Sequence, residues 1–109
     1  MPTTYKVLGQ VNPSVTTPTT LYTVPAGTQT VVSTISVANL TAGEIAFRIA
    51  IRPGGETLAT KHYIAYDAKV VGNDTTFITV GLTLGAGDVI TVYESAADLT
   101  FNAFGSEIN

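Results

Sequence analysis

Turn-forming residues interrupt this chain about every ten positions, and this spacing limits its fold more than any other feature. So short a segment holds one β-strand and leaves no room for the helical crossover that parallel strands need. Regular turns between short apolar segments are typical of an antiparallel sandwich or barrel. The turn signals are Pro13, Pro18, PAG at 25–27, AG at 42–43, PGG at 53–55, GND at 72–74, GAG at 85–87 and AAD at 96–98.

The side chains between these turns favour strands. Of 109 residues, 19 are Thr, 12 are Val and 8 are Ile, and branching at Cβ suits a pleated surface better than a helix. Apolar residues alternate with others over 44–52, where Ile45, Phe47, Ile49 and Ile51 share one face, and over 75–84, where Ile78, Val80, Leu82 and Leu84 do. The predicted strands span residues 5–11, 21–24, 28–39, 44–52, 60–66, 75–84, 89–94 and 99–104.

These segments predict an all-β fold, an antiparallel, jelly-roll-like β-sandwich of seven to eight strands that forms one domain over residues 1–109. We expect Phe47 and Phe101 in its core and a terminal hairpin formed by 89–94 and 99–104. The Pro- and Thr-rich residues 12–20 are predicted as an extended arm that packs on a neighbouring subunit, because Pro blocks regular strand pairing there. Residues 1–4 are a second candidate for an extended arm segment.

Charge is scarce, at 12% of residues, and the formal net charge is −3. The basic residues are scattered singly, so the chain lacks the basic face of a nucleic-acid-binding protein. No apolar run approaches the roughly 20 residues of a membrane helix, and the N-terminus lacks a signal-peptide pattern. We therefore expect no direct contact with nucleic acid or membrane. The absence of Cys fits synthesis in a reducing cytoplasm.

The residues that carry catalysis are few and dispersed. The chain has no Cys, a single His and no Ser in a Gly-x-Ser-x-Gly motif. His62 lies in a predicted strand and is expected at the surface or an interface. The eight acidic residues fall at predicted turns or strand ends. We predict no catalytic, cofactor-binding or metal-binding residues, and hence a protein that is not an enzyme.

Two binding hypotheses stay open beside this prediction. Asp67, Asn73 and Asp74 would form a calcium site if they met Asp88 at one end of the sandwich, although Asn and Asp are also common turn formers. Exposed tyrosines are suited either to subunit interfaces or to stacking on sugars or bases. Low charge and positive mean hydropathy favour an interface, because they leave apolar surface and strand edges unprotected.

Six blocks of sequence resemble small virion structural proteins of tailed bacteriophages, including cyanophages. Together they cover essentially the whole chain, whereas LYTVPAG alone recurs in many phage β proteins. The blocks are YKVLGQVNP at 5–13, TLYTVPAG at 20–27, VVSTI at 31–35, FRIAIRP at 47–53, KHYIAYD at 61–67 and FNAFGSE at 101–107.

The resemblance implies a virion structural protein with no catalytic residue to carry over. β-Sandwich proteins of this size serve as capsid decoration (cement) proteins, which form trimers on the outer capsid surface and bridge major capsid protein subunits. We therefore expect a homotrimer that is made in the host cytoplasm, binds the major capsid protein and stabilises the head. The alternatives are a tail, baseplate or fibre component and a carbohydrate-binding host-attachment module.

Overall fold

The computed structural model describes residues 2–79 and 81–109, which form nine strands and two three-residue 3₁₀ turns. Within these residues no helix is long and apolar enough to cross a membrane. The elements are β1 (Thr3–Val11), β2 (Thr19–Thr23), β3 (Gln29–Asn39), β4 (Ile45–Arg52), η1 (Pro53–Gly55), η2 (Thr60–His62), β5 (Tyr63–Val70), β6 (Thr75–Ile78), β7 (Leu82–Leu84), β8 (Val89–Glu94) and β9 (Leu99–Ile108).

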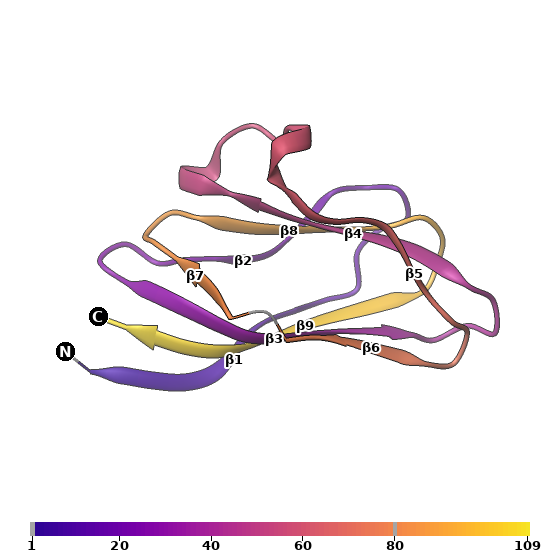
Figure 1. Ribbon diagram of the computed structural model, residues 1–109, viewed down its shortest axis with the longest axis horizontal. Helices are drawn as coiled ribbons and strands as arrows, with labels where there is room; N and C mark the ends of the chain where they lie inside the picture. Colours follow the sequence, from indigo (N-terminus) through magenta and orange to yellow (C-terminus); the bar gives the residue numbers. More distant parts are fainter. Residues whose placement is uncertain (1, 80) are drawn as a thin grey trace.

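The strands form two packed sheets (Figure 1). Sheet A has the order β1-β9-β3-β6, with β7 also paired to β3, and sheet B has the order β2-β8-β4-β5. The antiparallel pairs are nested along the chain: β1 with β9, β2 with β8, β3 with β6 and β7, and β4 with β5. Nested pairs that alternate between two sheets make a jelly roll. The predicted all-β, jelly-roll-like sandwich is therefore confirmed.

The strand count exceeds the prediction of seven to eight because residues 75–84 form two strands instead of one. Both β6 and β7 pair with β3, so they continue each other along its edge. Gly81, between them, has a φ of +61°, which is outside the strand region and ends the ladder. Val80 of the predicted apolar face lies outside the described residues.

The predicted terminal hairpin of 89–94 and 99–104 is wrong, because β8 belongs to sheet B and β9 to sheet A. The connection crosses the sandwich, so the two strands lie in opposite sheets and each buries one face in the core. Ile90 and Val92 of β8 are buried, as are Leu99 and Phe101 of β9. Two adjacent strands that each bury one face look alike in sequence whether they pair side by side or face each other.

The core lies between the sheets where the alternation predicted it. Ile45, Phe47 and Ile49 of β4 are 3% exposed or less. Phe47 of sheet B meets Phe101 of sheet A edge to face, with ring centroids 6.3 Å apart. Aromatic pairs favour this geometry, which ties the two layers together. The predicted core positions of Phe47 and Phe101 are confirmed.

Both predicted arms are built into the sandwich. Thr3 and Thr4 belong to β1 and pair with Ile108 and Glu107 of β9, which extends to residue 108 and not only to 104. Met1 lies outside the described residues.

Residues 12–20 are likewise attached to their own domain. The Asn12 side chain donates to the Asp98 carboxylate and to the Leu99 carbonyl, both at 2.8 Å. The Thr16 N–H donates to the Glu94 carbonyl, and residues 19 and 20 already belong to β2. Pro13 and Pro18 therefore mark a bend between β1 and β2, where the chain crosses from one sheet to the other.

Candidate functional site

His62 is buried within the chain's own fold, whereas the sequence predicted it at the surface or an interface. It ends the η2 turn, in the connection between β4 and β5 that folds over the outer side of sheet B. The Ala59 N–H donates to its Nδ1 at 3.0 Å, so Nε2 carries the proton that faces the Glu56 carboxylate at 3.1 Å. This hydrogen bond, helped by the charge of Lys61, lowers the pKa of Glu56. His62 therefore ties two parts of the connection together from a buried position.

The hypothetical calcium ligands do not come together. Asp74 lies beyond one end of β3, where its carboxylate accepts from the Thr75 N–H. Asp88 lies beyond the other end, where its two oxygens accept from the Gly54 and Gly85 N–H groups. Asp67 pairs with Arg48. Over residues 2–79 and 81–109 no three His, Cys, Asp or Glu side chains cluster as metal ligands would. Asp74 and Asp88 therefore stabilise turns, and Asp67 forms an ion pair between β5 and β4.

Glu94 is a buried carboxylate that sequence reasoning missed. It is 1% exposed and ends β8, and its Oε1 accepts from the Leu99 N–H at 3.0 Å. Its Oε2 has no partner among the described residues. Burial, with a smaller contribution from the charge of Asp98, raises the pKa of Glu94. The sequence did contain a signal for this burial. Alternate residues of a strand share one face, so Glu94 falls on the same inward face as Ile90 and Val92.

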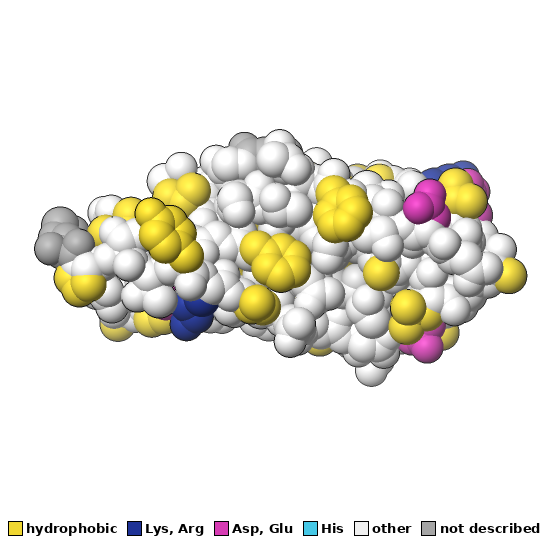
Figure 2. Space-filling model, turned by 90° about the horizontal axis from the view of Figure 1, so that it is seen from below, with side chains coloured by type: hydrophobic (Ala, Val, Ile, Leu, Met, Phe, Trp, Pro, Cys, Tyr) yellow, Lys and Arg dark blue, Asp and Glu magenta, His cyan; other side chains and the backbone are white. Residues whose placement is uncertain are grey.

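Exposed apolar side chains gather on the outer side of sheet A. Tyr5 and Val7 of β1, Phe104 of β9 and Phe77 of β6 are 83%, 47%, 36% and 68% exposed. We call this surface the apolar face. Val7 pairs with Phe104, and Phe77 pairs with Ser36 of β3. Figure 2 shows this side of the molecule, where separate hydrophobic side chains rise from an otherwise neutral surface and most of the charged groups lie towards its borders.

The charges of the neighbouring strand ends are paired with each other beside the apolar face. The Lys6 ammonium pairs with the Glu107 carboxylate at 3.3 Å. Glu107 also accepts from the hydroxyl of Tyr22, a buried residue of sheet B, at 2.6 Å. Both bonds lower the pKa of Glu107, while burial and the bond to Glu107 raise the pKa of Tyr22 to about 12. Glu107 thus points towards the opposite sheet.

Two shallow depressions follow the β1–β9 pair along the apolar face. One has a volume of about 490 Å³ and is lined by the apolar Tyr5, Val7, Val31 and Phe104 and by Lys6, among others. Gly105 also lines it, and a Cβ at this position would collide with the Val31 carbonyl, so only glycine lets the strands lie this close.

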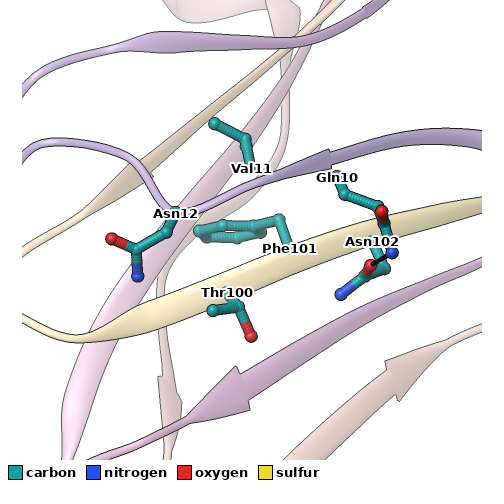
Figure 3. Close-up of a pocket in the computed structure, with 6 residues that line it drawn as sticks. All are labelled: Gln10, Val11, Asn12, Thr100, Phe101 and Asn102. Carbon is teal, nitrogen blue, oxygen red and sulfur yellow. Dashed lines mark hydrogen bonds between the residues drawn. The ribbon is translucent and has the colours of Figure 1, made fainter.

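The second depression, of about 390 Å³, continues towards the turn that follows β1 (Figure 3). Its polar lining is uncharged, and Gln10 donates to Asn102 across the strands at 2.7 Å. Phe101 lies beneath it and is fully buried. The arrangement offers apolar contact at one end and amide hydrogen bonding at the other, as a protein–protein contact surface does.

The outer side of sheet B has a different character. Cζ of Arg48 on β4 lies 4.1 Å from the ring centroid of Tyr66 and 4.3 Å from that of Tyr93. Its Nε donates to the Asp67 carboxylate at 2.7 Å, which keeps the pKa of the guanidinium above its usual value. Tyr63 packs edge to face against Tyr66. We call Arg48, Tyr63, Tyr66, Asp67 and Tyr93 the tyrosine face.

Comparison with known proteins gives only distant likenesses. No protein-family model matches the chain, and no curated protein matches it. Two solved structures of infectious bursal disease virus, from the Gt and Gx strains, are similar at 10% and 8% identity, with TM-scores of 0.45 and 0.43. The two matches cover 96% and 97% of this chain. This chain spans about a third (31%) of the length of each matched chain. Likenesses this distant carry no argument about function.

Proposed function

We propose that this chain is a non-catalytic structural protein of a virus particle, and specifically a capsid decoration protein that binds the major capsid protein through its apolar face. The observation that carries the proposal is the exposure of Tyr5, Phe77 and Phe104 on one sheet surface, beside which the charges of Lys6 and Glu107 pair with each other. Tyr5, Val7 and Phe104 line one depression, and exposed apolar groups brought together in this way usually mark an interaction site. The sequence resemblance to phage virion proteins supplies the kind of partner.

The energetics suit docking to a repeated surface. A buried aromatic anchor at an interface contributes about 2 kcal/mol or more, so a few anchors supply only moderate affinity once the cost of association is met. Binding as a homotrimer would engage several capsid subunits at once and convert weak contacts into firm attachment. The proposed trimer would bridge neighbouring subunits on the outer capsid surface and stabilise the head.

The jelly-roll topology is compatible with this role without selecting it. Jelly rolls occur in viral capsid proteins and in lectins, so the fold supports the proposal by analogy only. The second candidate is a tail, baseplate or fibre component, for which the same apolar face would pack in a ring. Copy number separates the two, because a decoration protein covers the head in many copies.

The test uses purified chain and particles of the encoding virus that lack it. The chain is expected to bind the particles with saturation, and mass spectrometry of native virions should find it in many copies on the head. Phe77→Asp should weaken binding, because it places a charge on the contact surface, whereas Tyr66→Asp on the opposite side should leave it intact. Equal binding by both variants, or absence of the chain from virions, contradicts the proposal.

A further inference from the structure

The tyrosine face carries a concave site, and we propose that this site binds a neutral saccharide. The concavity has a volume of about 330 Å³ and is lined by Thr60, Tyr63 and Tyr66. This lies at the lower end of the roughly 300–1,000 Å³ typical of small-ligand sites. It lies outside the apolar face on which the proposed docking depends, so the two proposals stand or fall separately.

Two tyrosines give the site its walls. The rings of Tyr63 and Tyr66 meet at an interplanar angle of 81°, with centroids 4.9 Å apart, and so form a corner. Tyr66 is 55% exposed, which leaves a large part of its side chain accessible to a ligand. The face of a sugar ring that carries C–H groups is apolar and stacks on an aromatic side chain, while its hydroxyls need hydrogen-bonding partners. Thr60 and the two phenols bring three hydroxyl groups, each of which can donate or accept.

The corner is held in place before any ligand arrives. Arg48 stacks on Tyr66 and is fixed in turn by Tyr93 and by Asp67. On the other side, Thr60 starts the η2 turn, which buried His62 fastens through the Ala59 N–H and Glu56. Side chains that are ordered in the free protein lose little entropy on binding, which raises affinity. The buried histidine therefore has a role in shaping the site.

The charges around the corner favour a neutral ligand. The Arg48 guanidinium is paired with Asp67, and Lys61 lies 3.7 Å from Glu56, so the nearby cations have acidic partners. A nucleobase also stacks on aromatic rings, but nucleic-acid sites combine stacking with a positive groove for the backbone. A saccharide without charge matches the aromatic corner and the hydroxyls and needs no unpaired cation.

The test is an NMR titration of the ¹⁵N-labelled chain with maltose, cellobiose, N-acetylglucosamine and methyl galactoside at millimolar concentration. At least one sugar should shift the amide signals of Thr60, Tyr63 and Tyr66 with saturation. Tyr66→Ala should weaken that binding about tenfold or more, the loss expected for one stacking partner. Thr60→Val, which keeps the shape but removes a hydroxyl, should weaken it less.

Phe77→Ala is the matched control, because it removes an exposed aromatic ring from the apolar face and should leave sugar binding unchanged. Adenosine monophosphate and N-acetylneuraminic acid test the charge argument and should give no saturating shifts at these residues. The proposal is overturned if no sugar shifts these amides, if Tyr66→Ala binds as well as the natural chain, or if the charged compounds bind equally well. None of these results affects particle binding by the apolar face.

Discussion

The two outer surfaces of the sandwich are built from strands of the same kind, yet they expose different chemistry. On the apolar face, Tyr5 and Phe77 are 83% and 68% exposed, and the nearby charges of Lys6 and Glu107 pair with each other. On the tyrosine face the aromatic rings are held by a charged partner, because Arg48 lies against both Tyr66 and Tyr93. Exposed apolar groups without such partners gain the most binding free energy when a large protein surface covers them, whereas an ordered aromatic corner suits a small ligand.

The comparison assumes that a single core holds both faces, and Phe101→Ala tests this assumption most severely. Phe101 is fully buried and contacts Phe47 of the other sheet, so its truncation leaves a cavity between the layers. The free energy of unfolding should fall by about 3–5 kcal/mol, measured by denaturant titration. Phe77→Ala, at an exposed site, should change it by less than about 0.5 kcal/mol. Similar losses in the two variants would contradict the assignment of core and surface.

The apolar face should account for most of the particle affinity. The double variant Phe77→Asp/Phe104→Asp removes two anchors of about 2 kcal/mol each, so the dissociation constant for particles should rise roughly a thousandfold. Fluorescence binding to particles measures the change, and circular dichroism confirms that the variant is folded. Tyr66→Asp serves as the control on the opposite surface. A larger loss in the control than in the double variant would reverse the roles of the two faces.

On the tyrosine face, Arg48→Ala should reduce stability moderately. The side chain stacks on two rings and pairs with Asp67, and such contacts near the surface together contribute about 1–2 kcal/mol. Thermal unfolding measures the loss. Arg48→Lys keeps the charge but not the planar group, so it should recover only part of the stability. Full recovery by Lys would show that charge alone matters there.

Glu94, at the crossover between the two sheets, should make the free energy of unfolding depend on pH. Its pKa is raised by burial, so the folded chain holds this proton more strongly than the unfolded chain does. The free energy of unfolding should therefore fall as the pH rises from the ordinary carboxyl pKa through the raised value. Glu94→Gln cannot ionise and should lack this fall, so it should gain stability over the natural chain as the pH rises.

Denaturant titrations of both chains across this pH range give the difference directly. Glu56 and Glu107 have lowered pKa values, so their contributions are lost as the pH falls, and they cancel in the comparison with Glu94→Gln. Glu44→Gln, at an exposed ion pair with Lys69, is the control. A pH-independent difference between Glu94→Gln and the natural chain would contradict the raised pKa.

The sequence predicted what depends on local pattern. Alternation over 44–52 correctly placed Ile45, Phe47 and Ile49 inside, and the spacing of turns predicted a sandwich. It could not show which sheet each strand joins, because jelly-roll pairing joins distant segments such as β1 and β9. The predicted hairpin at the end of the chain failed for this reason.

Sequence pattern predicted less of the candidate sites. Alternation placed Phe77 on the strand face opposite to the apolar residues of 75–84. Whether that face is exposed depends on whether another layer covers the outer side of sheet A, which the alternation does not show. His62 was misjudged because its burial comes from the fold of residues 53–62 over sheet B, a tertiary effect. The corner of Tyr63 and Tyr66 forms where the β4–β5 register shifts, which no local pattern predicts.

The central claim is that this chain docks on a virus capsid by its apolar face, and a cryo-electron microscopy map of the native virion tests it most directly. The account predicts trimeric jelly-roll density on the outside of the head, with β1, β9, β3 and β6 against the major capsid protein and the tyrosine face exposed. Density of this fold in the tail, docking through the tyrosine face, or no such density on the particle would contradict it.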